Sequence, residues 1–233
     1  MQSSTWRALG NTYVVVEADD DTQLEPADAV VLARGADGVL EVLAASDERV
    51  EIAIWNPDGS RAELSGNGTR IAAAWLTARS GVERIEVVVG ERSVITRVLG
   101  DGVLEQDLGE VTVAPPETIE GLSVTPVSVG NPHAVVVGDP DTIAHIGPLL
   151  ETHPRFSDRT NVQVARIDAP GQVTARVWER GVGETASSGT SAVAVAAATH
   201  GEGNVVVRFP GGELRVRIAN GRAWLYGSAE RVS

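Results

Sequence analysis

Two short stretches of this 233-residue chain combine a serine with glycine at the start of an alanine-rich run: Ser65–Gly68 and Ser188–Thr190. The start of a helix carries unsatisfied N–H groups and a partial positive charge, which together attract a carboxylate. Glycine also lets a ligand approach the backbone closely. Two such helix starts that face each other would hold one small anionic molecule from opposite sides. Serine is equally an ordinary helix N-cap, so both interpretations stay open on the residues alone.

Other side chains with reactive groups show weaker patterns. The four histidines, His133, His145, His153 and His200, have no metal-binding spacing, so we expect no metal site. His133 is interpreted as a structural loop residue. Neither serine lies in a GxSxG motif, which argues against a serine hydrolase. Glu179 and Arg180 precede the second helix start, and they form either a solvated pair or a binding group in which arginine takes a substrate carboxylate.

The composition excludes several classes of protein. The chain has no cysteine and no lysine, so thiolate metal sites, thiol nucleophiles, pyridoxal enzymes and Walker-type phosphate loops are ruled out. A net charge of −13 argues against nucleic acid and anionic membranes as partners. There is no apolar run near the ~20 residues that a membrane span needs, and no secretory signal. We therefore expect a cytoplasmic protein with a small-molecule ligand.

Short β-branched runs bounded by turn residues dominate the chain and predict many strands, residues 29–33 (AVVLA) among them. Three stretches predict helices instead, at residues 69–80, 141–153 and 190–201. Asp141 is the expected N-cap of the second helix, and Gly201 resembles a C-cap of the third. The alternation of many strands with few helices indicates the α+β class.

The chain also repeats itself. A Gly-Asn pair precedes a valine run at Asn11 and again at Asn131, 120 residues later. Ser-Gly opens an alanine-rich helix at Ser65 and again at Ser188, 123 residues later. Two different features with nearly one offset indicate two similar halves, each a strand-rich unit with one central helix. Residues 111–121, with paired prolines, are the expected linker.

Taken together, these segments resemble the diaminopimelate epimerase family. The matching segments follow in order along nearly the whole chain: LGNTYVVVE, GADGVL, NPDGSRAELSGNGTR, VGNPHAVVV, HPRFSDRTNVQV, VWERGVGET with SSGTS, and AWLYGSAE. The resemblance implies two pseudo-symmetric halves, each a β-barrel-like sheet around a central helix, with the ligand in the cleft between them. The expected halves are residues 1–115 and 116–222, and residues 223–233 are expected to form a terminal strand that returns to the N-terminal half.

The resemblance also implies a reaction without a cofactor. Two bases flank the Cα of a diamino acid; one removes its proton and the other delivers a proton to the opposite face, which interconverts LL- and meso-diaminopimelate in lysine and cell-wall precursor synthesis. The catalytic positions carried over are Ser65 and Ser188. The implied substrate-binding residues are the amides Asn11, Asn56, Asn131 and Asn161, the charged Glu179 and Arg180, and the backbone donors Gly66, Asn67, Gly189 and Thr190. Donors aimed at the reacting carboxylate would stabilise the carbanion-like transition state.

The sequence departs from the family at its two catalytic cysteines, which are serines here. A free thiol has a pKa of ~8.5, whereas an alcohol lies near the ~15.7 of water. That difference corresponds to about 10 kcal/mol for making the base, and a helix start supplies only ~0.3–2 kcal/mol. We therefore expect the two-base epimerisation that thiolates carry out to be severely impaired in this chain.

Three interpretations of the serines stay open. Both cysteines were replaced, or a natural branch uses serine or another base such as Glu179, or the cleft was kept while the chemistry changed or was lost. The alternative functions are a related isomerase of the proline-racemase or phenazine-pathway type and a non-catalytic amino-acid-binding protein. The resemblance also favours a homodimer.

Overall fold

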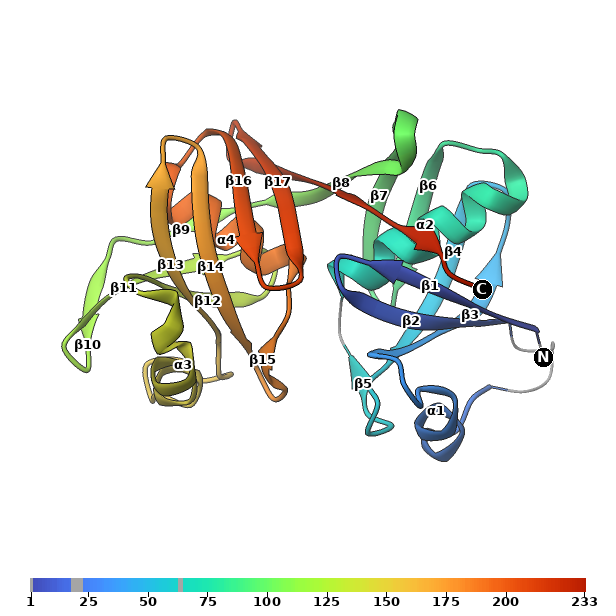
Figure 1. The fold of residues 1–233 in the computed structure, drawn as a ribbon, viewed down its shortest axis with the longest axis horizontal. Helices are drawn as coiled ribbons and strands as arrows, with labels where there is room; N and C mark the ends of the chain where they lie inside the picture. Colours follow the sequence, from blue (N-terminus) through green and yellow to red (C-terminus); the bar gives the residue numbers. More distant parts are fainter. Residues whose placement is uncertain (1, 18–22, 63–64) are drawn as a thin grey trace. The chain divides into compact units, whose positions relative to one another are not determined.

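The computed structural model describes residues 2–17, 23–62 and 65–233 (Figure 1). The chain divides into two compact units: Met1–Gln106 with Tyr226–Ser233, and Asp107–Leu225. It passes from the first unit to the second within strand β8 (Val103–Glu110) and returns within β18 (Arg222–Ser228), and these two strands pair with each other.

The first unit is a mixed sheet with a long helix packed against it. Its main strands are β1 (Gln2–Ala8), β2 (Asn11–Glu17), β3 (Gly38–Ala45), β4 (Arg49–Trp55), β6 (Arg84–Val89) and β7 (Arg92–Val98). Antiparallel and parallel pairings alternate across this sheet: β1–β2, β3–β4 and β6–β7 are antiparallel, while β2–β3 and β4–β6 are parallel. The shorter elements are β5 (Arg61–Ala62), β19 (Glu230–Arg231), α1 (Pro26–Leu32) and the 3-10 turn η1 (Gly100–Gly102). The long helix is α2 (Gly66–Ser80).

The second unit repeats this plan. Its main strands are β11 (Leu122–Ser128), β12 (Pro132–Val137), β13 (Asn161–Ala169), β14 (Gln172–Glu179), β16 (Gly203–Phe209) and β17 (Gly212–Ala219). The β11–β12, β13–β14 and β16–β17 pairs are antiparallel, and β12–β13 and β14–β16 are parallel. The remaining elements are β9 (Thr112–Val113), β10 (Glu117–Ile119), β15 (Gly183–Thr185), η2 (Pro140–Thr142), α3 (Ile143–Glu151) and α4 (Gly189–His200).

The two units therefore share one order of strands, one order of strand directions and one order of helices. Even the irregularities correspond, because the register shifts between Val42 and Ala44 in β3 and between Ile167 and Ala169 in β13. The predicted internal repeat and the predicted fold, a sheet around one central helix in each half, are confirmed. Residues 111–121, expected to be a linker, carry β9 and β10, and both of these strands pair with β11.

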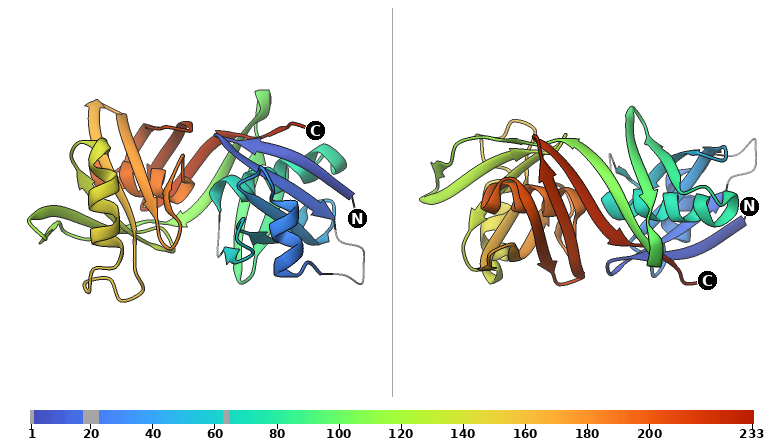
Figure 2. Two further views of the ribbon diagram at one scale, coloured as in Figure 1. Left: turned by 60° about the horizontal axis from the view of Figure 1, so that its bottom comes forward. Right: turned by 90° about the horizontal axis from the view of Figure 1, so that it is seen from above.

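The helices α2 and α4 are enclosed by the strands of their own units (Figure 2). Every residue from Gly189 to Ala197 of α4 is buried, and Ile71, Ala72 and Trp75 of α2 lie in the core of the first unit. A helix that is apolar on all sides is one that protein surrounds. The alanine-rich sequence serves this position, since small side chains let strands approach the helix from several sides.

Two expectations about local structure are wrong. Residues 29–32 belong to helix α1, with Ala33 as its C-cap, and not to a strand, because Pro26 occupies the first helical position and Glu25 and Asp28 form a reciprocal capping box. Asp141 is not the N-cap of a helix; Asp139 caps η2 instead, with its side chain accepting from the Asp141 N–H, and α3 begins at Ile143. Gly201 is the C-cap of α4, as predicted, and its N–H bonds to the Ala197 carbonyl.

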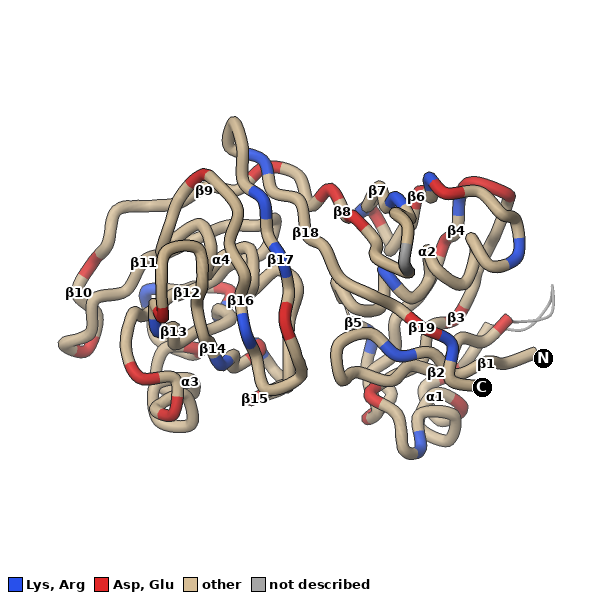
Figure 3. Tube along the Cα trace, turned by 45° about the horizontal axis from the view of Figure 1, so that its top comes forward, with Lys and Arg blue, Asp and Glu red and all other residues tan. Residues whose placement is uncertain are grey.

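Acidic and basic residues are interspersed along the strands and turns of both units (Figure 3). Many of them form exposed pairs, such as Arg49 with Glu86 and Arg208 with Glu213. Exposed pairs of this kind stabilise a fold by only ~0–1 kcal/mol each, so the fold rests on its buried strands and helices. Within the described part of the chain, no helix is both long and apolar enough to cross a membrane.

Candidate functional site

Ser65 is the N-cap of α2 and also contacts a tyrosine. Its backbone is extended, its Oγ accepts from the Gly68 N–H at 3.0 Å, and its carbonyl accepts from the Thr69 N–H at 2.8 Å. Its Oγ also lies 3.1 Å from the Tyr13 hydroxyl of β2. A Cβ on Gly68 would lie 3.2 Å from the Ser65 Cβ, so glycine lets the first turn close tightly on the serine. The N-cap interpretation is confirmed for Ser65, and its hydroxyl has a second partner in Tyr13.

Asn67, in the first turn of α2, joins a buried chain of polar side chains. Its amide nitrogen donates to the Asn11 oxygen, and its own oxygen accepts from the Arg70 guanidinium. Arg70 also donates to Gln106 at 3.1 Å, and Gln106 donates to Thr69 at 2.8 Å. Two predicted site residues, Asn11 and Asn67, are therefore held together by hydrogen bonds. Gln106 was missed because its partners Arg70 and Thr69 lie 36 and 37 residues away in the sequence, and Arg70 was missed because nothing in the sequence marks this arginine as buried.

Arg70 is a fully buried cation whose hydrogen-bond partners are neutral amides. Burial lowers the pKa of Arg70 to about 9, which still leaves the side chain charged at neutral pH. Its Nε has no hydrogen-bond partner among the described residues. A buried charge without an opposite charge is costly, and it raises the potential of its surroundings. Together with the helix dipole, Arg70 makes the start of α2 favourable for an anion.

The described hydrogen bonds of Asn56 do not join it to this network. It ends β4 and begins the NPDGS turn, where its amide nitrogen donates to the Ser60 hydroxyl at 2.9 Å and its N–H donates to the Ser60 carbonyl at 2.8 Å. Asp58 accepts from the same hydroxyl at 2.6 Å, and these hydrogen bonds lower the pKa of Asp58. The structure thus places Asn56 in an ordered turn without joining it to Asn11 or Asn67.

Ser188 holds the equivalent position at the start of α4, but its hydroxyl has a different partner. Its carbonyl accepts from the Ala192 N–H at 3.0 Å, while its side chain makes no capping bond. The hydroxyl bonds instead to the carboxylate of Glu179, which also accepts from Thr185 at 2.5 Å. Burial raises the pKa of Glu179 against the opposing effect of these two hydrogen bonds. Gly189 and Thr190, the next two residues, are buried in the first turn of the helix.

Asn161 and Arg180 are joined through the backbone. The Asn161 side chain accepts from the Arg180 N–H at 3.0 Å and donates to the Pro132 carbonyl at 3.0 Å. The Arg180 guanidinium donates to the Asp158 carbonyl at 2.9 Å. In the second unit, the predicted residues therefore form two adjoining groups: Ser188 with Glu179, and Asn161 with Arg180.

A buried carboxylate, Glu151 at the end of α3, holds the turn that carries Glu179 and Arg180. It accepts from the Gly181 N–H at 2.7 Å and from the Trp178 indole at 2.8 Å, and it pairs with Arg159 at 2.5 Å. The sequence offers no local signal for this role, since the carboxylate lies 27 residues before the tryptophan.

His133 lies in strand β12, fully buried, and not in a loop as predicted. Its Nε2 is 3.0 Å from the Asn131 side-chain oxygen, and its Nδ1 is 3.0 Å from the Gln163 amide nitrogen, which also donates to Ser191. Burial lowers the pKa of His133 to about 3, so the ring is neutral. A neutral ring that accepts from Gln163 donates to Asn131 and fixes the orientation of that predicted amide.

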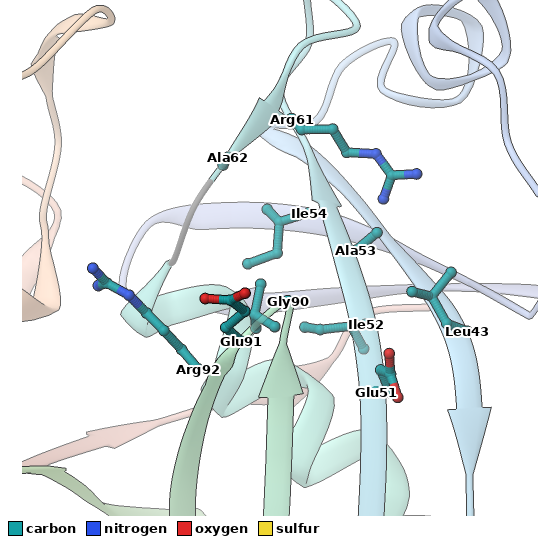
Figure 4. A pocket seen from close by; sticks show the side chains of 11 residues that line it. Leu43, Glu51, Ile52, Ala53, Ile54, Arg61, Ala62, Gly90, Glu91 and Arg92 are labelled. Atoms are coloured by element: carbon teal, nitrogen blue, oxygen red, sulfur yellow. The ribbon is translucent and has the colours of Figure 1, made fainter.

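A pocket of about 510 Å³ in the first unit contains none of the predicted site residues (Figure 4). It opens beside β4, between β5 and the turn from β6 to β7. Its walls include the aliphatic Ile52 and Ile54 and the charged Arg61 and Glu91. Arg61 stacks 3.6 Å from the centre of the Trp55 ring and pairs with the buried Glu41 at 3.3 Å, so this arginine is already held by the fold.

Comparison with known proteins agrees with the repeat. The diaminopimelate epimerase family matches over residues 6–113 and 125–232. A diaminopimelate epimerase of Desulforudis audaxviator is 35% identical and covers 100% of this chain and 97% of its own length. One from Synechocystis is 36% identical, with coverages of 98% and 96%.

Solved structures share the fold at low identity. A predicted epimerase from Pseudomonas aeruginosa has a TM-score of 0.77 at 17% identity and covers 99% of this chain and 96% of its own. A phenazine biosynthesis protein from Bacillus anthracis has a TM-score of 0.75 at 14% identity, with the same coverages. A probable proline racemase from Agrobacterium radiobacter has a TM-score of 0.68 at 13% identity, with coverages of 99% and 91%.

The family match over both halves, with relatives that are diaminopimelate epimerases, places this chain among the isomerases. Within that class, the chain belongs to the diaminopimelate epimerase family.

Proposed function

We propose that this chain is a diaminopimelate epimerase that interconverts the LL and meso stereoisomers without a cofactor. The observation that carries the proposal is the retained set of binding groups around both helix starts. Asn11 and Asn67 are hydrogen-bonded to each other beside Ser65, and Glu179 is bonded to Ser188. The reaction belongs to lysine and cell-wall precursor synthesis, so we propose a cytoplasmic enzyme.

In this proposal, the carboxylate on the reacting carbon is bound by backbone donors of the two helix starts. They are the N–H groups of Gly66 and Asn67 and of Gly189 and Thr190. When the Cα proton leaves, negative charge moves onto that carboxylate, and donors already oriented toward it stabilise the transition state. The buried Arg70 strengthens this effect in the first unit, because its positive charge is not neutralised by a described carboxylate. Arg180 binds the distal carboxylate group of the substrate, while Glu179 is engaged by Ser188.

A hydroxyl needs a neighbouring base to take a proton from carbon. Ser188 has one, because its hydroxyl donates to Glu179, whose pKa is raised by burial. A base with a pKa closer to the working pH accepts a proton more effectively. As Ser188 takes the Cα proton, its own proton passes to Glu179, and the reverse transfer delivers a proton to the carbanion.

Exchange of the substrate Cα proton with solvent deuterium tests the proposal. We expect mass spectrometry to detect deuterium in diaminopimelate incubated with this chain in D₂O, together with interconversion of the LL and meso forms. The double variant Ser65→Cys/Ser188→Cys should exchange faster, because a thiol is far more acidic than an alcohol. Absence of exchange from both proteins would contradict the proposal.

The second candidate function is binding of a diamino acid without catalysis. The observation that favours it is the oxygen at both catalytic positions, which costs about 10 kcal/mol in acidity relative to sulfur. Calorimetry separates the two functions, since tight binding of diaminopimelate without exchange would favour the binding protein. The proline-racemase and phenazine-pathway alternatives share the fold. The same exchange assay tests them when proline or a phenazine precursor replaces diaminopimelate as the substrate.

A further inference from the structure

Ser65 has a neighbour that no feature of the sequence singled out. Tyr13, the third residue of β2, places its hydroxyl 3.1 Å from the Ser65 Oγ across 52 residues of sequence. The tyrosine is buried, and both residues belong to the first unit. The contact therefore lies within one unit.

The surrounding fold fixes both ends of this contact. The tyrosine ring lies against Gly38, where an added Cβ would come within 2.8 Å of the ring Cε1. At the other end, the Ser65 Oγ accepts from the Gly68 N–H, which holds the hydroxyl at the start of the helix. Either hydroxyl of the pair can donate to the other, so a proton can pass in both directions along this hydrogen bond.

The two hydroxyls of this contact differ greatly in acidity. A free phenol has a pKa of ~10, whereas an alcohol lies near ~15.7. The phenol therefore releases its proton roughly half a million times more readily. A phenol is also only about thirtyfold less acidic than a thiol, whose pKa is ~8.5. Tyr13 thus brings an acidic group, close in acidity to the thiol it would replace, within one hydrogen bond of Ser65.

We propose that Tyr13 is the proton-relay partner of Ser65, and that the pair replaces the thiol on that side of the substrate. This inference rests on the proposed epimerase function. In one direction, the Cα–H bond breaks, Ser65 Oγ takes that proton, and the original hydroxyl proton of Ser65 passes to the Tyr13 phenolate. In the other direction, Tyr13 gives its proton to Ser65 as Ser65 delivers one to the carbanion. Tyr13 acts through Ser65 and is a positioning and relay residue.

The residue of the second unit that corresponds to Tyr13 is His133, and it has different partners, which supports a specific role for Tyr13 beside Ser65. His133 follows Asn131 by two residues, as Tyr13 follows Asn11, but its two nitrogens are engaged by Asn131 and Gln163. The partner of Ser188 there is Glu179. Each serine is therefore bonded to a more acidic group, a phenol in one unit and a carboxylic acid in the other.

The test is a cycle of Tyr13→Phe and Ser65→Cys, with deuterium exchange at the Cα of diaminopimelate as the readout. Phenylalanine keeps the ring that packs against Gly38 and removes only the hydroxyl. We expect Tyr13→Phe to lower kcat at least 100-fold with little change in KM. In the Ser65→Cys background, the same change should lower kcat less than threefold, because a thiol ionises without the phenol. Tyr226→Phe, which changes the other tyrosine of the chain, is the matched control.

The pH profile is the second readout. The kcat/KM of the unchanged protein should rise toward pH ~10, where free phenols ionise, and Tyr13→Phe alone should abolish that rise. Equal losses from Tyr13→Phe in the unchanged protein and in the Ser65→Cys background would assign the tyrosine a purely structural role and overturn the relay. Exchange by Ser65→Cys/Ser188→Cys but none by the unchanged protein would also overturn the relay, and it would favour the second candidate function, binding without catalysis, for this chain. Absence of exchange from every form would overturn both.

Discussion

The two serines have different neighbours although they hold equivalent places in the repeat. Ser65 is bonded to the Gly68 N–H and to Tyr13, whereas Ser188 is bonded to Glu179. The sequence predicted both serines at helix starts, because the Ser-Gly pattern is local. It did not predict Tyr13, since that contact depends on how β2 packs beside α2. Residues that act through distant partners are the ones a local pattern cannot identify.

Replacement of Glu179 should separate stability from activity. Burial raises the pKa of Glu179 above that of the unfolded chain, so the folded protein binds the proton more tightly. Its stabilising effect is full at low pH and is lost as the pH rises through the folded pKa. Glu179→Gln should therefore lower the pH dependence of the melting temperature above pH ~4.3 and abolish exchange. Melting temperatures of both proteins, measured from pH ~4 to ~8, check this prediction, because the range starts near the pKa of glutamate in the unfolded chain. The same pH dependence of the melting temperature in both proteins would contradict it.

Asn67→Asp should stabilise the protein and impair its function. The new carboxylate would pair with the buried Arg70, and the Asn11 side chain would turn its amide nitrogen to donate to the second carboxylate oxygen. A hydrogen bond to a charged group stabilises by about 1 kcal/mol more than a neutral one. For a chain of this length, that corresponds to a rise in melting temperature of ~2–4 °C. The negative charge would repel the substrate carboxylate, so kcat/KM should fall at least 100-fold. Asn204→Asp, at an exposed position of β16, is the control and should change neither quantity. A fall in melting temperature would contradict the account of Arg70.

Among the helices and strands, those with a local sequence signal could be predicted, and contacts between distant segments could not. The starts of α2 and α4 follow from the serines and glycines, and the strands follow from the valine-rich runs. Helix α1 was missed, because AVVLA has the composition of a strand and its helix signal lies upstream, in Pro26 and the capping box. The role of Glu151 was also missed, because groups from two later segments meet at its carboxylate: Arg159 from one, and Trp178 and Gly181 from the other.

Helix α3 positions the turn that carries Glu179 by packing against Trp178. A Cβ at Gly147 of this helix would lie 2.6 Å from the Trp178 Cγ and 2.7 Å from its Cβ, so the tryptophan must move when alanine is introduced. Gly147→Ala should destabilise the protein by ~1–3 kcal/mol and raise KM, since Trp178 directly precedes Glu179. Denaturant unfolding and steady-state kinetics measure both effects. Gly100→Ala, where a Cβ meets nothing within 4 Å, should be neutral; equal effects of the two changes would contradict this role of α3.

At the scale of the whole molecule, the repeat is the feature that the sequence predicted best. Two motifs at nearly one offset indicated two halves, and the strand directions and register shifts of the two units agree with that. The proposed function adds that each unit supplies one helix start to a single ligand. Short motifs can indicate this arrangement by resemblance, but only a ligand that responds to both units can demonstrate it.

Amide NMR during titration with meso-diaminopimelate tests this claim most directly. We expect the N–H signals of Gly66–Gly68 and of Gly189–Ser191 to shift together, with one dissociation constant and saturation at one ligand per chain. Shifts confined to one of the two helix starts, or two different dissociation constants, would contradict it.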